Sequence, residues 1–270
     1  TMKVTNPEMI RAVTKEWDGE RDSNGRPLVP DDILERMKLV TTEEAWGTCK
    51  SNGYAFQFAG DWMNLHPDRV LVGRAVTCRW VPRRPDVHDS IDKQGEQDQR
   101  VGFQNSWVID ELGQGDLIVV DLFGKIFNGT FAGDNLATAI KSRSGTGMVI
   151  DGGIRDTQRI LEMDEFNAFI RGVDPSAILD VSMPDINGIT RIGEATCVPG
   201  DVVLGTSTGV IFIPPHLALE VVERSEAIRL KDAFGQQRIR EGVYTPGEVD
   251  RKFSEDMDKD FEEWKANRPK

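Results

Sequence analysis

The 270-residue sequence predicts an α/β fold, because strand-like and helix-like segments alternate through its middle. Residues 69–81 alternate apolar and polar positions as a strand does, and a helix-like segment at 103–112 separates them from the apolar run 117–124. Helix and strand follow each other again, because residues 136–143 have apolar side chains at helical spacing and precede the buried-strand run 147–151. This strand–helix–strand order is typical of α/β proteins.

The first sixty residues predict helices joined by a loop. Asn6 is a favoured N-cap and Pro7 a favoured first helical residue, and the segment 30–40 again opens with a proline. Residues 18–30 (DGERDSNGRPLVP) are rich in turn-forming residues and predict the loop between these helices.

The polar run 82–99 shows no packing period, so it predicts a loop or an exposed helix. It gathers four potential ligands, Asp86, His88, Asp89 and Asp92, whose spacing matches no familiar metal geometry. A solvated surface, a substrate-facing loop and a second metal site all remain open for this group.

The C-terminal half predicts short strands and then a helix. A strand is expected at 166–172, further short strands within 176–213, and a hairpin with a glycine-containing loop at 198–215. A helix over 217–229 is expected to close the core. The last forty residues are charged and mostly polar, which predicts an arm or a peripheral helix.

Composition narrows the function classes. A formal charge of −12 argues against nucleic acid as a partner, because clustered Lys and Arg carry most of that affinity. No apolar run reaches the roughly 18 to 20 residues that span a bilayer, and the first residues lack signal-peptide features, so we expect a cytoplasmic protein without membrane association. Cys49, Cys78 and Cys197 are widely spaced, which predicts core thiols rather than disulfides or a zinc site.

The segment GDNLATAIKSRSGTGMVIDGGIRD places charged side chains in two turns. Asp134 stands where a helix begins, and the first-turn amides of Asn135 and Leu136 suit an anion such as a substrate carboxylate. Arg155 and Asp156 follow a strand at its carboxyl end, where open α/β sheets bind ligands. One helix and one strand bring the chain back to the same end of the sheet, so the turns can meet. From the residues alone, an Arg–Asp pair that binds neighbours or caps the next helix remains the alternative.

This segment resembles the signature of the family that contains 4-hydroxy-4-methyl-2-oxoglutarate aldolase, 4-carboxy-4-hydroxy-2-oxoadipate aldolase and the regulator of ribonuclease activity A (RraA). The aldolase members have an Asp, twenty residues and then Arg-Asp, a pattern that Asp134, Arg155 and Asp156 fit. The pieces GRAVTCR, GDLIVVD, FIRGVDP and VPGDVVLGTSTGVIFIP extend the similarity over roughly residues 35–230.

The resemblance implies a layered, swivelling β/β/α core of the RraA-like type over residues 35–230. A helical extension at 1–34 and a charged arm at 231–270 would be added to it. Members of this family assemble as trimers or hexamers with active sites between subunits, so a homotrimer or homohexamer is expected.

The resemblance also implies a class II pyruvate aldolase, which cleaves a 4-hydroxy-2-oxo acid to pyruvate and has oxaloacetate decarboxylation as a side activity. Asp156 would bind a divalent metal directly and Asp134 through a water. Mg²⁺ is the expected metal and Mn²⁺ is the alternative. Both ions favour oxygen ligands such as these carboxylates. The amides of Asn135 and Leu136 would hold the substrate carboxylate, and Arg155 would stabilise the enolate.

Two other interpretations remain open: a non-catalytic regulator that binds a ribonuclease or another protein, and a related sugar-acid dehydratase or decarboxylase. The intact acid–Arg–acid set favours an enzyme. Lys141 lies mid-helix without signs of the desolvated pocket that a Schiff-base lysine requires, which argues against a metal-free aldolase. The residues leave the general base and any acid from a neighbouring subunit unassigned.

Overall fold

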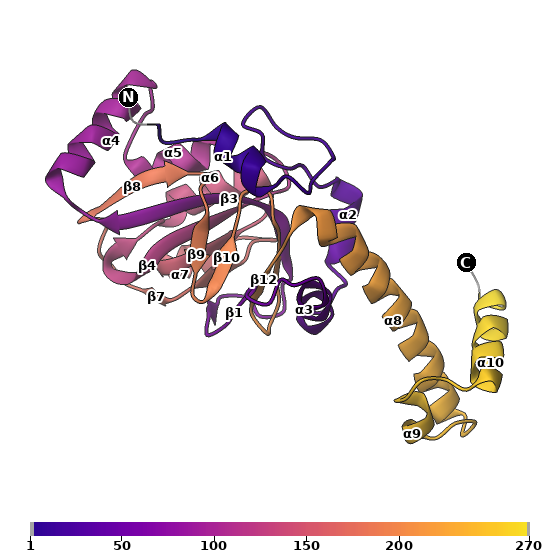
Figure 1. The fold of residues 1–270 in the computed structure, drawn as a ribbon. Helices are drawn as coiled ribbons and strands as arrows, with labels where there is room; N and C mark the ends of the chain where they lie inside the picture. Colours follow the sequence, from indigo (N-terminus) through magenta and orange to yellow (C-terminus); the bar gives the residue numbers. More distant parts are fainter. Residues whose placement is uncertain (1–2, 269–270) are drawn as a thin grey trace. The chain divides into compact units, whose positions relative to one another are not determined.

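Figure 1 shows the computed structural model, which describes residues 3–268. These residues form two compact units, one ending at Val221 and the other starting at Val222. None of the helices between residues 3 and 268 is long and apolar enough to cross a membrane.

The described part of the first unit contains a ten-stranded mixed sheet and a separate two-stranded hairpin. The sheet strands are β1 (Phe58–Ala59), β2 (Met63–Asn64), β3 (Leu71–Pro82), β4 (Asp116–Thr130), β5 (Met148–Ile154), β6 (Ala168–Ile170), β7 (Gly172–Val173), β8 (Val181–Ile186), β11 (Val202–Gly205) and β12 (Val210–Ile213). The hairpin strands are β9 (Thr190–Ile192) and β10 (Ala195–Cys197). In the order β1-β12-β11-β3-β4-β5-β6-β2, the pairs β3–β4, β4–β5 and β5–β6 are parallel and the other neighbouring pairs are antiparallel. The hairpin predicted at 198–215 is formed by β11 and β12.

Helices connect and cover these strands. They are α1 (Pro7–Val13), α2 (Asp31–Met37), α3 (Thr42–Ser51), α4 (Pro85–Gln97), α5 (Gln104–Asp110), α6 (Asp134–Ser144), α7 (Thr157–Leu161), the short 3₁₀ helix η1 (Pro215–Leu217), α8 (Ala218–Arg240), α9 (Pro246–Val249) and α10 (Glu255–Ala266). As predicted, Asn6 caps α1 by accepting a hydrogen bond from the Met9 amide, with Pro7 at the first helical position. In α2, by contrast, Pro30 is the N-cap itself and provides no side-chain hydrogen bond.

The sheet is covered on both faces by apolar side chains. On one face, Ile118 and Ile150 belong to a buried cluster with residues of α4 to α7, such as Ile140. On the other face, Val119 belongs to a cluster with residues of the β9–β10 hairpin, such as Ile192. Alternate residues of the central strands therefore face a helical layer and a second β layer, which confirms the predicted α/β fold class (Figure 1).

The three cysteines are buried free thiols, as the spacing predicted. Burial raises the pKa of Cys49, Cys78 and Cys197, so each stays protonated near neutral pH.

The polar run 82–99 forms the helix α4, and the prediction that it lacks a packing period was wrong. His88, Ile91 and Gly95 are buried at spacings of three and four residues. The Gly95 backbone lies so close to Trp107 that an added Cβ would overlap the indole ring. A hydropathy pattern does not show this helical spacing of buried residues, because a histidine and a glycine occupy two of the three inward positions.

His88 joins α4 to the edge strand β8. Its Nδ1 lies 2.7 Å from the Ser182 Oγ, and its Nε2 lies 3.3 Å from an Asp92 carboxylate oxygen. Gln104 donates a 2.8 Å hydrogen bond to Asp92 and accepts one of 2.7 Å from the Met183 amide. The acid-and-histidine group therefore lies on a helix rather than a loop, and its histidine has a structural role.

We predict that His88→Ala lowers the free energy of unfolding by about 2 to 3 kcal/mol, because it leaves the fully buried Ser182 hydroxyl without this partner and opens a cavity. Urea unfolding followed by tryptophan fluorescence measures the change. Asp89→Ala, on the exposed side of the same helix, is the control and should change stability little. Equal stability of the two variants would contradict the structural role of His88.

The helix expected at 217–229 is longer than predicted, because α8 continues to Arg240. The second unit has its own aromatic cluster, in which Phe234 is fully buried and Phe253 and Met257 are nearly so. Arg238 binds Asp260 beside it, with Nε and Nη2 at 2.9 and 2.5 Å. The charged composition of the last forty residues had hidden these few packing positions.

Candidate functional site

The two charged turns of the segment 133–156 adjoin each other in the structure. The helix α6 begins at Asp134, and the strand β5 ends just before Arg155. The Arg155 amide donates to the Ala132 carbonyl at 3.0 Å, and the Asp134 amide donates a longer bond of 3.4 Å to the Asp156 carboxylate. Residues more than twenty positions apart are therefore held together by the backbone itself.

Gly133 makes this close approach possible. It is the N-cap of α6, and a Cβ at this position would overlap the Asp156 Oδ2 and lie 3.1 Å from the Arg155 Nε. Its φ of −103° is available to any residue, so the requirement for glycine comes from space rather than from backbone conformation. The chain thus leaves room at Gly133 for a carboxylate.

Asp156 is turned toward α6 rather than toward the helix that it precedes. Its backbone is left-handed, with φ of 56°, and as N-cap of α7 it makes no side-chain capping hydrogen bond. Aspartate adopts this conformation more readily than most residues, and Asp61 and Asp180 share it in this structure. The alternative in which Asp156 caps the following helix therefore does not describe this structure.

Arg155 is held loosely. Its Nη1 lies 3.5 Å from the Thr130 carbonyl and 3.4 Å from the Thr130 hydroxyl, and its Nε lies 3.9 Å from the Asp156 carboxylate. These separations are at the long limit of hydrogen bonding. The guanidinium, about a third exposed, therefore keeps donor capacity for a bound anion.

Asp134 has a partner that the sequence did not reveal. Arg159, on the first turn of α7, donates a 2.8 Å hydrogen bond to the Asp134 carboxylate. This hydrogen bond holds the pKa of Asp134 below its usual range and raises the pKa of Arg159. The sequence carries no signal for this contact, because Asp156 precedes α7 with a left-handed backbone and helical spacing does not relate Arg159 to Asp134.

The amides of Asn135 and Leu136, which are proposed to hold a substrate carboxylate, come before the first backbone hydrogen bond within α6. That hydrogen bond runs from the Ala137 amide to the Gly133 carbonyl. In this structure the Asn135 amide donates to the Asp134 Oδ1 at 2.9 Å, so a ligand would have to replace that contact. Leu136 is half-buried and packs against the core, which fixes the turn.

The oxygen donors here suit a hard divalent cation in part. The partly exposed carboxylate of Asp156 lies at Gly133 and accepts from the Asp134 amide, while the carboxylate of Asp134 binds Arg159. Across residues 3–268, no three His, Cys, Asp or Glu side chains gather in a metal-holding group. Two carboxylates with the remaining positions filled by water is an arrangement that Mg²⁺ accepts, so the residues fit such an ion.

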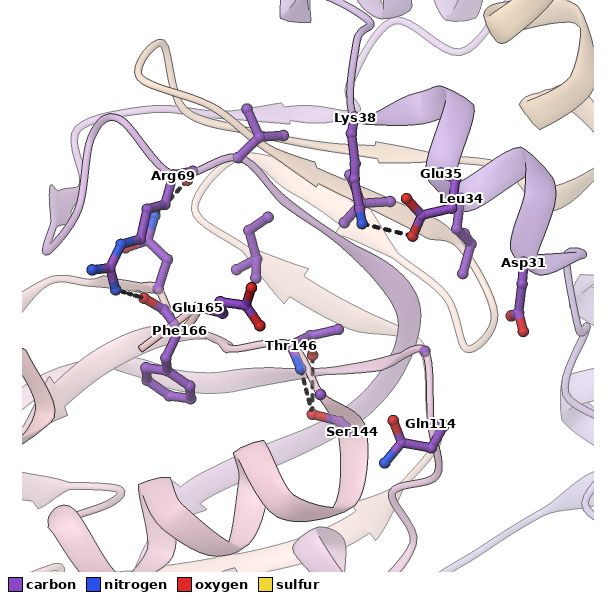
Figure 2. A pocket seen from close by; sticks show the side chains of 16 residues that line it. Asp31, Leu34, Glu35, Lys38, Arg69, Gln114, Ser144, Thr146, Glu165 and Phe166 are labelled. Atoms are coloured by element: carbon purple, nitrogen blue, oxygen red, sulfur yellow. Dashed lines mark hydrogen bonds and ion pairs between the residues drawn. The ribbon is translucent and has the colours of Figure 1, made fainter. Parts of the chain in front are cut away.

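A cavity of about 510 Å³ lies elsewhere, lined by residues around the start of β3 and the end of α6 (Figure 2). Lys38 donates to the Glu35 carboxylate at 2.6 Å and Arg69 donates to the Phe166 carbonyl, and dashed lines mark both contacts in Figure 2. Because Asp134 and Asp156 lie at the opposite ends of α6 and β5 from this cavity, we assign the charged turns, not the cavity, as the candidate site.

Comparison with known proteins identifies a protein family whose model the chain matches. Residues 49–212 match the family model RraA-like, described as Aldolase/RraA. The chain is 29% identical over 133 residues to a Halalkalibacterium halodurans protein named "Putative 4-hydroxy-4-methyl-2-oxoglutarate aldolase"; the alignment covers 49% of this chain and 62% of that protein. The matched stretches thus span less than two thirds of the length of the curated relatives.

Two solved structures share the fold. Streptomyces coelicolor RraAS2, described as an unusual member of the RNase ES inhibitor RraA protein family, matches with a TM-score of 0.67 at 22% identity, over 82% of this chain and all of that one. An uncharacterized protein from Pseudomonas syringae pv. tomato matches with a TM-score of 0.67 at 20% identity, over 86% of this chain and 98% of that one. At these identities the likeness concerns the fold alone.

Proposed function

The chain belongs to the RraA-like family, and from this premise we propose that it is a divalent-metal-dependent lyase that cleaves a 4-hydroxy-2-oxo acid and releases pyruvate. The family includes both aldolases and ribonuclease inhibitors, so membership alone does not select the activity. The observation that carries the proposal is the contact between the turns, which brings the carboxylate of Asp156 to the amide of Asp134, with the Arg155 Nε 3.9 Å from the same carboxylate.

The proposed reaction breaks the bond between C3 and C4 of the substrate. The C4 hydroxyl loses a proton, its oxygen forms the new carbonyl, and the electron pair of the broken bond passes to the 2-oxo group as the pyruvate enolate. Protonation of C3 then completes pyruvate. The barrier falls when negative charge on the 2-oxo oxygen is stabilised, which is the task of Arg155 as a cationic donor.

Asp156 would hold the metal directly and Asp134 through a water molecule. A bound Mg²⁺ or Mn²⁺ supplies Lewis-acid stabilisation of the enolate charge, a contribution of several kcal/mol. The amides of Asn135 and Leu136 would bind the C1 carboxylate, with Asn135 exchanging its contact with Asp134 for the substrate. Arg159 would keep the Asp134 carboxylate ionised through the 2.8 Å contact.

The test is a coupled assay of pyruvate release on 4-hydroxy-4-methyl-2-oxoglutarate, 4-carboxy-4-hydroxy-2-oxoadipate and oxaloacetate. We expect EDTA to remove the activity and Mg²⁺ or Mn²⁺ to restore it. Activity that survives full chelation would contradict the metal dependence. Failure to turn over any member of the panel with metal present would contradict the lyase and favour the non-catalytic regulator.

We also propose that the chain assembles as a homotrimer or homohexamer whose active sites lie between subunits. The two carboxylates of one chain leave several positions of an octahedral ion open, and a neighbouring subunit could fill one. Light scattering combined with the pyruvate assay tests this assembly. A monomer with full activity would rule out an active site shared between subunits.

Gly133→Ala is predicted to lower kcat/KM by about 10²-fold, because the new methyl group displaces the Asp156 carboxylate and small misplacements of catalytic groups cost about that much. The pyruvate assay gives the rate, and circular dichroism monitors the fold. Gly47→Ala is the matched control, since a Cβ there meets nothing within 4 Å. Equal activity of both variants would show that the space at Gly133 is not used.

A further inference from the structure

Thr130, the last residue of β4, contacts the guanidinium group of Arg155. Thr130 is fully buried, and its hydroxyl and its carbonyl oxygen lie 3.4 and 3.5 Å from the Arg155 Nη1. The Arg155 Nη2 has no hydrogen-bond partner within residues 3–268. The contact with Thr130 therefore restrains one end of the guanidinium and leaves donors at the other end for a bound anion.

The Thr130 hydroxyl can only accept a hydrogen bond from Arg155, because its own proton is already used. It donates that proton to the Ser176 carbonyl. A hydroxyl has one proton and two lone pairs, whereas a guanidinium has donors alone. The lone pairs that remain on Thr130 therefore match the Nη1 hydrogens, and the bond to Ser176 sets the direction in which they point.

The Ser176 carbonyl belongs to a loop that is tied to both neighbouring strands. The Ser176 Oγ accepts from the Asn128 amide of β4 at 2.7 Å, and the Ser176 amide donates to the Asp174 Oδ1 at 2.9 Å. Hydrogen bonds from Ser176 hold the pKa of Asp174 below its usual range, so this acceptor is ionised at neutral pH. The Asp174 amide donates to the Ile154 carbonyl at 3.2 Å. The loop thus fixes the Ser176 carbonyl relative to β4 and to the end of β5.

The contacts between Thr130 and Arg155 are long, at the limit of hydrogen bonding. In many enzymes, catalytic hydrogen bonds are long before the substrate binds and shorten in the complex. Negative charge at the remaining donors of the guanidinium would polarise the whole group and strengthen the bond from Nη1 to the Thr130 hydroxyl. The long separations are therefore compatible with a contact that matters when charge develops.

We propose that Thr130 is a positioning residue for the lyase reaction, which accepts from Nη1 and so aims the other donors of Arg155 at the 2-oxo oxygen where the enolate charge forms. This inference rests on the proposed function. Because Thr130 is fully buried, it acts on the reaction through Arg155 alone. Its direction matters, since donors stabilise a developing charge only where they are already aligned with it.

Thr130→Val, which keeps a similar side-chain shape and removes the hydroxyl, tests the proposal. We expect kcat for pyruvate release to fall about tenfold with little change in KM, because the group that Thr130 aims acts on the transition state. Thr130→Ser keeps the hydroxyl and should recover most of the activity. Thr77→Val is the matched control, since Thr77 is also fully buried and its hydroxyl donates to the Gly188 carbonyl at 2.7 Å. The control should leave kcat unchanged.

A double variant separates positioning from structural support. Thr130→Val added to Arg155→Lys should lower kcat no further, because the guanidinium that Thr130 aims is then absent. A further fall in the double variant would overturn the proposal. An equal fall in kcat in Thr77→Val, or a change in Thr130→Val that is confined to KM, would overturn it as well.

Chemical modification of the arginines gives a readout that needs no turnover. Phenylglyoxal modifies accessible guanidinium groups, and peptide mass spectrometry compares Arg155 with the exposed Arg159 as an internal reference. Relative to Arg159, we expect Arg155 to react several-fold faster in Thr130→Val than in the wild-type chain or in Thr77→Val. An unchanged ratio would overturn the proposal. A wild-type chain that turns over no substrate would contradict the lyase and this inference with it, whereas an active chain with unaffected Thr130→Val kinetics would contradict this inference alone.

Discussion

Asp156→Asn is expected to lower pyruvate release by about 10³-fold or more, because it removes the negative oxygen that would bind the metal directly and so several kcal/mol of transition-state stabilisation. Mg²⁺ binds carboxylate oxygens far better than a neutral amide. The backbone should tolerate the change. Asn, like Asp, adopts the left-handed conformation seen at position 156, so the turn keeps its geometry.

The pyruvate assay measures this loss, and Mn²⁺ binding followed by electron paramagnetic resonance shows whether the metal is lost with it. Asp164→Asn is the matched control, since Asp164 is an exposed acid on the loop after α7. We expect the control to keep both activity and metal. An Asp156→Asn chain that binds Mn²⁺ and turns over normally would remove Asp156 from the metal site.

Much of the site was predictable because short-range patterns define it. Gly133 and Asp134 mark a helix start, and the apolar run before Arg155 marks a buried strand, so the bounds of α6 and β5 follow closely from the sequence. Parallel pairing of β4 with β5 then puts both turns at one end of the sheet. The meeting of the turns was therefore a consequence of one helix and one strand.

The finer contacts of the site could not be predicted. The collision of a Cβ at Gly133 with Asp156 depends on the distance between two backbones, which no local pattern encodes. The pairing of Arg159 with Asp134 depends on how α7 leaves the sheet. Hydropathy identified neither, because all of these side chains are polar and lie at a partly exposed surface.

Buried positions were missed for a related reason. His88 packs inward as a satisfied polar residue, so a hydrophobicity period across α4 does not include it. Phe234 anchors a small aromatic cluster inside a strongly charged segment, where the average composition favoured an arm.

Arg155→Lys is expected to lower kcat by on the order of 10², because a lysine offers a mobile point charge where the planar guanidinium presents several donors in fixed directions. The Arg155 backbone is fixed by the bond from its amide to the Ala132 carbonyl. Its side chain lies against Thr130 and Asp156 at long distances, so its donors remain usable. A group that stabilises only the enolate should affect kcat more than KM.

Steady-state kinetics with the preferred substrate separates the two roles open to Arg155. A fall in kcat with little change in KM supports enolate stabilisation, whereas a rise in KM at constant kcat would assign Arg155 to holding the ground-state substrate. Arg143→Lys is the control, since Arg143 pairs with Asp110 at the far end of α6 and should leave both constants unchanged. Wild-type kinetics in the Arg155 variant would remove it from catalysis. Asp156→Asn tests whether a bound metal stabilises the enolate charge, and Arg155→Lys tests whether the guanidinium does. If only one of the two variants loses activity, the residue changed in that variant is the one on which stabilisation of the charge depends.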